Sequence, residues 1–315
     1  MTGINGFAGS HLADYINANH NEFEIHGTVR EHSNLDSIQQ IRNNVVLHLS
    51  DLSDIESIVS ILRNIQPDKI FHLAAQSMVM KSFDDPTNTF QTNITGTLNL
   101  LEAIRKTNID PIVQICSSSE VYGKVNEDEI PIKENVSFFP VNPYGVSKVA
   151  VDRLGYQYFQ SYGLRTVITR AFPHTGPRRA QIFAESSFAK QLVDIENGKN
   201  NVVLVGNLDS VRTFLDVRDM VEAYWRSTEK CIFGEAYNIG SEMPIIMKDL
   251  LAKLVALSKV NASIKQDATL LRPNDTSYHI PDTSKFRKQT GWNPRITLEQ
   301  TLTDLLDYWR QYSKK

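Results

Sequence analysis

The sequence predicts an α/β protein in which a doubly wound parallel sheet forms the larger part and a smaller α/β domain follows. Short β-branched runs alternate with amphipathic helical stretches through the first half of the chain, a pattern typical of βαβ units in a sheet covered on both faces. The alternation changes after Ala171, where prolines and a polar stretch interrupt it. We therefore expect one domain over residues 1–172 and a second over 173–315, interleaved because parts of 212–240 return to the first.

The expected elements follow from the period of the apolar residues along the chain. Strands of the first domain are expected at 23–29, 45–49, 69–73, 112–117 and 165–171. Helices between them are expected at 11–18, 55–64, 89–106 and 148–162. In the second domain we expect a strand at 236–239 and helices at 212–227, 247–257 and 298–309. Because crossovers between parallel strands are right-handed, these elements predict a doubly wound sheet.

Composition and charge exclude several classes of protein. The 315 residues carry 33 basic and 36 acidic side chains, a net charge of −3, so the sequence has no electrostatic footprint for nucleic acid or an anionic membrane. No apolar run reaches the roughly 18 residues of a membrane-spanning helix, and no secretory leader opens the sequence. Cys116 and Cys231 are far apart, and none of the 8 histidines has a zinc-binding spacing. We expect a cytoplasmic globular protein without a metal site.

A glycine-rich loop opens the chain. Gly3, Gly6 and Gly9 form a GxxGxxG pattern directly before an expected helix, which indicates a dinucleotide pyrophosphate bound at the helix N-terminus. A Rossmann unit places a strand before such a loop, but only Met1 precedes Thr2. We expect the strand in the middle of the sheet to be missing, through truncation or a start assigned too late. Its two neighbours would then lack ladder partners.

The residue after the next expected strand indicates which dinucleotide binds. NAD enzymes carry a ribose-binding carboxylate about twenty residues after the glycine loop. This sequence has Arg30 at that place. A guanidinium suits a 2′-phosphate through paired, charge-assisted hydrogen bonds, so we expect NADP. The alternative is a solvated loop cation.

Two further segments carry the groups needed for proton transfer. Tyr144 and Lys148 are four residues apart and so share one helix face. Ser118 and Glu120 follow an apolar strand, at the sheet edge where α/β proteins bind ligands. A phenol with a pKa near 10 is rarely ionised at neutral pH, and lowering the pKa to about 7 requires roughly 4 kcal/mol. A neighbouring ammonium and a cationic nicotinamide can supply that stabilisation.

Several motifs in order give the chain a clear family resemblance. They are TGINGFAG at 2–9, Asp51-Leu52, HLAAQS at 72–77, SSSEVYG at 117–123, NPYGVSK at 142–148, HTGPRR at 174–179, VRTFLDVRD at 211–219 and GWNP at 291–294. With them the chain resembles the extended short-chain dehydrogenase/reductases. It is most similar to their branch of GDP-mannose 4,6-dehydratases and GDP-4-keto-6-deoxymannose reductases.

The resemblance implies a role for individual residues. It implies that Tyr144 and Lys148 are the catalytic pair and that Ser118 binds the 4-hydroxyl of the sugar. It also matches Glu120 to the acid–base carboxylate of the dehydratases. Residues implied to bind NADP are Gly3, Gly6, Phe7, Gly9, Arg30, Asp51, Leu52, Leu73, Ala74, Ala75, Tyr144, Lys148, His174 and Arg179. Residues implied to bind the GDP-sugar are Ser77, Asn142, Lys190, Arg212 and Arg272; for Arg212 and Arg272 surface salt bridging is the alternative.

The resemblance leaves the reaction open. The first expectation is NADP-dependent dehydration of GDP-mannose to GDP-4-keto-6-deoxymannose, and the alternative is an NADPH-dependent reductase of that product. Residues 186–227 resemble the reductase, whereas Arg178-Arg179 is typical of the dehydratase. Pro173 replaces the usual asparagine, which, with the missing strand, keeps a catalytically silent cofactor-binding regulator as a third alternative. The family also implies a homodimer or homotetramer built on the helices at 89–106 and 148–162.

Overall fold

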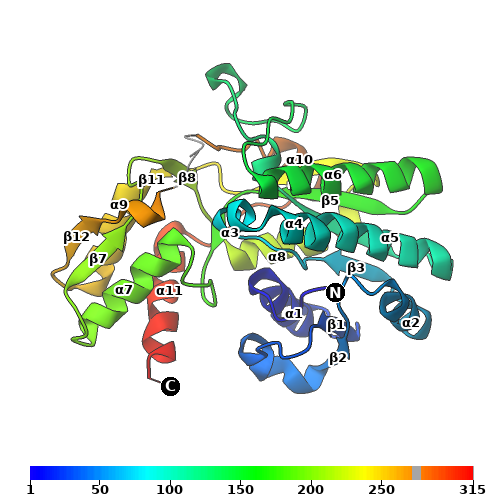
Figure 1. The fold of residues 1–315 in the computed structure, drawn as a ribbon, viewed down its shortest axis with the longest axis horizontal. Helices are drawn as coiled ribbons and strands as arrows, with labels where there is room; N and C mark the ends of the chain where they lie inside the picture. The colour runs from blue at the N-terminus through cyan, green and yellow to red at the C-terminus, as the bar shows by residue number, and fades with distance from the viewer. Residues whose placement is uncertain (272–277, 315) are drawn as a thin grey trace.

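The computed structural model describes residues 1–271 and 278–314 and has the expected α/β architecture around a parallel sheet (Figure 1). Parallel pairing joins the strands in the order β10, β5, β4, β3, and separately joins β1 to β2. The strands are β1 (Ile25–Val29), β2 (Val45–Leu49), β3 (Lys69–His72), β4 (Ile112–Ser118), β5 (Thr166–Ala171) and β10 (Ala236–Ile239). Each lies within two residues of its predicted bounds.

The expected gap in the middle of this sheet is present between β1 and β3. Thr2 forms single parallel bridges to Thr28 on one side and His72 on the other. Its backbone N–H donates to Phe71 O at 3.0 Å, and Thr28 N–H donates to Met1 O at 3.0 Å. Met1 and Thr2 thus stand in for a strand between β1 and β3.

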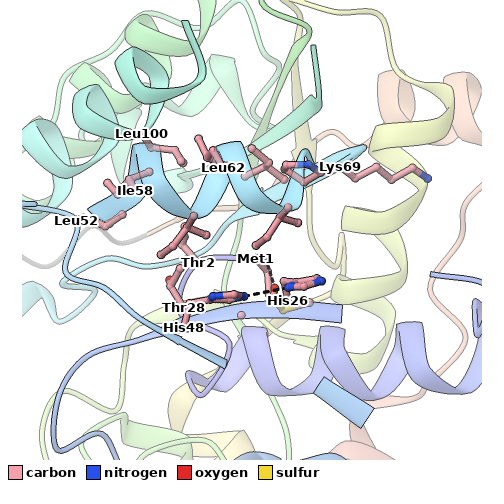
Figure 2. A pocket seen from close by; sticks show the side chains of 15 residues that line it. Met1, Thr2, His26, Thr28, His48, Leu52, Ile58, Leu62, Lys69 and Leu100 are labelled. Carbon is pink, nitrogen blue, oxygen red and sulfur yellow. Dashed lines mark hydrogen bonds between the residues drawn. The ribbon is translucent and has the colours of Figure 1, made fainter. Parts of the chain in front are cut away.

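A cavity of about 60 Å³ occupies part of this gap (Figure 2). Its lining includes Met1, residues of β1 such as Thr28, and apolar side chains of α2 (Ile55–Ile65) such as Ile58 and Leu62. The Met1 ammonium donates to His26 O at 2.6 Å, and burial lowers its pKa to about 5. Neither Tyr144 nor Lys148 lines this cavity, so it belongs to the gap in the sheet and not to the predicted catalytic group.

Helices cover both faces of the sheet, as a doubly wound fold requires. The face carrying α2, α5 (Gly96–Thr107) and α6 (Pro143–Tyr162) has a core that includes Leu100, Ile104 and Val151. The other face carries α1 (Phe7–Asn19) and α8 (Val217–Lys230), whose core includes Leu12 and Trp225. Figure 1 shows the two helix layers on opposite sides of the strands.

The single helix predicted over 89–106 is wrong in detail. The segment begins as α4 (Pro86–Phe90), widens into a π-helical turn at Gln91–Thr95, and continues as α5. Asn93 lies in this turn, accepts from Gln76 N–H at 2.8 Å and donates to Ser147 Oγ at 2.9 Å. The side chain of Asn93 thus links this wide turn to Gln76 and Ser147, and wide turns of this kind often lie beside functional sites.

A further group of elements forms a second lobe, at the left of Figure 1. It contains α7 (Ala184–Glu196), β7 (Val202–Val205), α9 (Met247–Ser258), β12 (Ser263–Gln266) and α11 (Leu298–Tyr312), with β12 parallel to β7. These elements share a core of their own that includes Leu192, Leu250 and Leu305. The shorter elements are α3 (Val79–Asp84), α10 (Ser284–Thr290), β6 (His174–Thr175) and β11 (Pro244–Ile246).

The helix predicted over 212–227 begins later than expected. Residues before it form β8 (Val211–Thr213), antiparallel to β11, and β9 (Leu215–Asp216), parallel to β6. The Asp216 carboxylate accepts from Arg218 N–H at 2.8 Å and so caps α8. Both α8 and β10 pack in the expected first domain: α8 packs against α1, and β10 pairs with β5. The domain boundary between residues 172 and 173 stays a prediction.

Candidate active site

The structure brings the predicted catalytic residues together where β4 meets the start of α6. Ser118 ends β4, Glu120 lies in the turn that follows, and Tyr144 and Lys148 lie on successive turns of α6. Tyr144 and Lys148 are buried, whereas Glu120 is half-buried. The hydroxyl of Ser118 accepts from Glu120 N–H at 3.2 Å.

Asn142 ties this turn to the helix. Its Nδ2 donates to Glu120 Oε2 at 2.8 Å, and its Oδ1 accepts from Gly145 N–H at 2.7 Å, which caps α6. A Cβ on Gly145 would lie 2.6 Å from Glu120 O, so a glycine is required for α6 to begin this close to the turn. The first turn of α6 and the Glu120 backbone are therefore packed directly against each other.

The protein's own side chains favour the neutral phenol. Burial raises the pKa of Tyr144 above its usual value, while the Ser118 hydrogen bond and the Arg179 charge act in the opposite direction. Lys148 Nζ donates to Cys116 O at 2.7 Å and lies 5.8 Å from the Tyr144 ring centre. Burial also lowers the pKa of Lys148. The phenolate expected from the sequence therefore needs positive charge beyond these side chains.

The predicted glycine loop turns tightly into α1. Gly6 N–H donates to Gly3 O at 3.0 Å, Gly3 has a φ of +68°, and a Cβ on Gly9 would lie 2.2 Å from Gly3 O. Gly6 is the N-cap of α1 and offers no capping side chain. The first N–H groups of α1 therefore lack a side-chain acceptor, which is the arrangement that binds a phosphate.

The end of β3 lies against this loop. Thr2 Oγ1 accepts from Leu73 N–H at 3.2 Å and from Ala74 N–H at 3.1 Å. A Cβ on Gly3 would lie 3.0 Å from Ala74 Cα. Leu73, Ala74 and Ala75 are half-buried, so this segment follows the glycine loop along one edge of the sheet.

Arg30 and Asp51 follow neighbouring strands and interact with each other. Arg30 is exposed directly after β1, and Asp51 is exposed shortly after β2. Hydrogen bonds from Ser53 lower the pKa of Asp51, and the Arg30 charge acts in the same direction. Leu52 packs against α5, because a Cβ on Gly96 would lie 2.9 Å from the Leu52 Cβ.

The HTGPRR segment lies over the start of α1. The His174 ring stacks on Phe7 with ring centres 5.8 Å apart, and the Arg179 guanidinium lies 5.0 Å from the Phe7 ring centre. Burial lowers the pKa of His174 to about 4, with the Arg179 charge acting in the same direction. Arg179 Nε donates to Glu185 Oε1 at 3.2 Å. The three predicted cofactor residues Phe7, His174 and Arg179 therefore form one cluster.

Arg178 anchors that segment, a role the sequence did not reveal. Its Nη2 donates to Asp14 Oδ2 at 2.6 Å and its Nη1 to Ser37 O at 2.7 Å. His11, on α1, lies 2.8 Å from Pro177 O through Nε2. The pair of arginines in HTGPRR was the available signal, but only the packing separates their roles.

The predicted substrate residues are spread more widely. Ser77 is exposed after β3, and Asn142 lies beside Glu120. Lys190 forms an ion pair with Asp194 at 2.6 Å on α7, and Arg212 on β8 donates to Val211 O at 2.8 Å. Arg272 lies outside the described residues.

Comparison with known proteins shows the family to which the chain is similar. A family model described as GDP-mannose 4,6 dehydratase matches residues 1–305. The GDP-6-deoxy-D-mannose reductase of Pseudomonas aeruginosa is 33% identical over 310 residues, which cover 98% of this chain and 96% of the relative. The GDP-mannose 4,6-dehydratase of Vibrio cholerae serotype O1 is 30% identical over 346 residues, covering 97% and 91%.

Solved structures give the same fold. The structure of RMD from Pseudomonas aeruginosa complexed with NADPH has a TM-score of 0.86 and 32% identity, covering 98% of this chain and 97% of that one. UDP-glucose 4-epimerase of Thermotoga maritima with UDP-glucose has a TM-score of 0.90 and 25% identity, covering 99% and 98%. With its glycine loop, its Tyr144–Lys148 pair and these matches, the chain belongs to the GDP-mannose 4,6-dehydratase family of sugar-nucleotide-modifying extended short-chain dehydrogenase/reductases.

Proposed function

We propose that this protein is an NADP-dependent dehydratase that converts GDP-mannose to GDP-4-keto-6-deoxymannose. The observation that carries the proposal is the placement of Glu120 beside Tyr144, with its carboxylate held by Asn142 at 2.8 Å. Dehydration requires a base for the proton at C5 and an acid for the leaving hydroxyl at C6, whereas simple reduction at C4 requires neither. A half-buried carboxylate next to the phenol provides both functions.

In this proposal, different residues of the chain have separate roles in the reaction. Bound NADP, which Arg30 and the first turn of α1 would hold, would supply the hydride acceptor for C4 and the hydride for C6. Ser118 orients the C4 hydroxyl, and Tyr144 takes its proton with Lys148 nearby. The new C4 ketone acidifies the C5 proton, which Glu120 removes, and the same carboxyl then protonates the C6 oxygen that leaves as water. The enolate formed when the hydride adds at C6 takes a proton at C5 from Tyr144, which returns the proton taken from the C4 hydroxyl.

Support for NADP comes from both ends of the predicted cofactor site. The first turn of α1 offers N–H groups without a side-chain cap, which fits a pyrophosphate. Arg30 is exposed after β1, where a guanidinium fits a 2′-phosphate. The similar reductase structure from Pseudomonas aeruginosa was solved with NADPH.

The reductase is a second candidate, and the comparison with relatives supports it. The alignment with the Pseudomonas aeruginosa reductase spans 310 residues for 98% of this chain, so it contains almost no insertions. The alignment with the Vibrio cholerae dehydratase needs 346 residues for 97% of this chain. The neutral Tyr144 phenol favoured by burial is also the form that would protonate a C4 oxygen during reduction.

Product analysis separates the two candidates. The protein is incubated with GDP-mannose and a trace of NADP, and in parallel with a GDP-4-keto-6-deoxy sugar and NADPH. Loss of water from GDP-mannose without net NADPH consumption supports the dehydratase. Net NADPH consumption on the keto sugar, with no reaction of GDP-mannose, rejects it. Cofactor binding without turnover in either mixture is the result expected of a silent regulator.

Glu120→Gln gives an independent test in the same assay. In a dehydratase, hydride can still leave C4, but no base removes the C5 proton, so reduced cofactor accumulates while product formation falls about 10²–10⁴-fold. In a reductase, the same variant keeps near-normal activity, because no C5 proton leaves.

We also propose that the protein forms a homodimer, or a homotetramer built from it, through α5 and α6. Leu98 on α5 and Tyr156 and Tyr162 on α6 are exposed at 37%, 45% and 51%, and this apolar surface is available for packing against a second copy. Light scattering, which measures the molar mass in solution, checks the assembly.

No helix within the described residues has the length and hydropathy to cross a membrane. The cytoplasmic location stays a prediction.

A further inference from the structure

One buried amide joins the predicted base to the helix that carries the predicted tyrosine. Asn142 is 6% exposed, and the oxygen and nitrogen of its side-chain amide bond to different segments. Oδ1 accepts from Gly145 N–H at 2.7 Å, and Nδ2 donates to Glu120 Oε2 at 2.8 Å. We infer that Asn142 is a positioning residue that fixes the Glu120 carboxylate relative to Tyr144. The inference rests on the proposed dehydratase function, in which Glu120 moves protons.

The orientation of the amide is determined by the backbone. Gly145 N–H can only donate, so the atom of Asn142 that faces it must be the oxygen. The amino group is then necessarily on the side of Glu120, where it can only donate to the carboxylate. Because Asn142 Oδ1 caps α6, the atom of Asn142 that faces Glu120 is the hydrogen-bond donor Nδ2.

The Glu120 backbone is fixed to the same place. Glu120 N–H donates to Ser118 Oγ at 3.2 Å, and Glu120 O lies where a Cβ on Gly145 would come within 2.6 Å. Tyr144 lies between Asn142 and Gly145 in the first turn of α6. One turn of helix thus carries the phenol and, through Asn142, holds the carboxylate, so their separation is set within one rigid element.

This assignment differs from the direct substrate contact expected for Asn142. A contact with substrate would appear mainly in KM. A residue that holds the base acts on the step at C5 and would lower kcat while leaving the KM for GDP-mannose nearly unchanged. The two roles are therefore separable by steady-state kinetics.

Matched variants separate positioning from helix capping. Serine and aspartate cap helices about as well as asparagine, so Asn142→Ser and Asn142→Asp should keep the melting temperature of the wild type, whereas Asn142→Ala should lower it. The shorter serine side chain cannot reach Glu120 while capping Gly145. The aspartate side chain reaches it but presents an oxygen and a negative charge in place of the donor.

The expected kinetics differ among these variants. Asn142→Ser should lower kcat for dehydration about 10-fold or more, and reduced cofactor should build up during turnover because C4 oxidation is unaffected. Asn142→Asp should lower kcat further at neutral pH and recover as the pH rises, since a neighbouring carboxylate favours the protonated form of Glu120. The other ionisable groups that face this site are Tyr144, Lys148, Cys116 and, beyond them, Arg179, and all four are unchanged in every variant.

A double-mutant comparison completes the test. If Asn142 acts through Glu120, adding Asn142→Ser to Glu120→Gln should cause no further loss of kcat. An additive loss, or wild-type kcat in Asn142→Ser and Asn142→Asp alongside an inactive Glu120→Gln variant, overturns the inference and leaves the dehydratase proposal intact. Normal turnover by Glu120→Gln overturns the dehydratase proposal and, with it, this role for Asn142.

Discussion

Acidification should destabilise this protein through its buried histidines, and His72 provides the sharpest test. His72 ends β3, is 4% exposed, and has its ring nitrogens 2.9 Å from Thr2 Oγ1 and 2.9 Å from Thr97 Oγ1. Burial lowers the pKa of His72 from 6.5 to about 3, and the Lys148 charge acts in the same direction. Between these two values the unfolded chain binds a proton that the folded protein does not, so stability falls as the pH falls through this window.

The magnitude follows from the two pKa values. At pH 5 the pH lies about 1.5 units below the pKa of the unfolded histidine, which is therefore protonated, while the folded histidine stays neutral. Each of these pH units corresponds to about 1.4 kcal/mol of unfolding free energy. Moving from pH 7 to pH 5 should therefore remove about 2 kcal/mol of stability through His72 alone. Glutamine keeps a donor and an acceptor at this position but does not titrate.

Urea unfolding of the wild type and His72→Gln at pH 7 and pH 5 measures this contribution. The wild type should lose about 2 kcal/mol more than the variant on acidification. His11 and His174, whose pKa values burial lowers to about 3 and about 4, are present in both proteins and cancel in the comparison. An equal loss in the two proteins would refute the reasoning.

Three further variants test the cofactor site, the phenol and a required glycine. Arg30→Asp should weaken NADPH binding by about 100-fold, through loss of charge-assisted hydrogen bonds, and shift preference towards NAD; binding titrations check this, and a wild type that already prefers NAD would contradict it. Tyr144→Phe should lower kcat by about 10²–10⁴ with NADPH affinity and melting temperature preserved; an unfolded variant would instead indicate a structural role. Gly123→Ala should cost more than about 2 kcal/mol in chemical denaturation, since Gly123 has a φ of +56° and a Cβ there would lie 1.8 Å from Phe139 O; an unchanged unfolding midpoint would disprove it.

Much of the fold was predictable because its signals are local. The strand at 45–49 was predicted with the bounds of β2, whereas the helix predicted over 148–162 begins earlier, at Pro143, where Asn142 caps α6. The helix at 212–227 was wrong at its start, because short strands such as β8 and β9 pair with distant partners and leave only a weak period in the sequence. The π-helical turn around Asn93 was also missed, and its contact with Ser147 on another helix is not visible in the local period of the sequence.

The candidate site divides in the same way. The sequence alone determined which chemical groups are available: the glycine loop before α1, the Tyr144–Lys148 spacing, and the serine and glutamate at the end of a strand. These features depend on spacing within one element, and such spacing is readable from the chain.

Only the tertiary structure decided which of these groups touch. The donor to Glu120 comes from Asn142, 22 residues away, and the anchor of the HTGPRR segment joins Arg178 to Asp14 across 164 residues. The balance of charge at Tyr144 was also decided there, because burial opposes the effect of neighbouring cations on its pKa. Contacts and burial depend on how whole elements pack against one another, and no local period in the sequence carries that information.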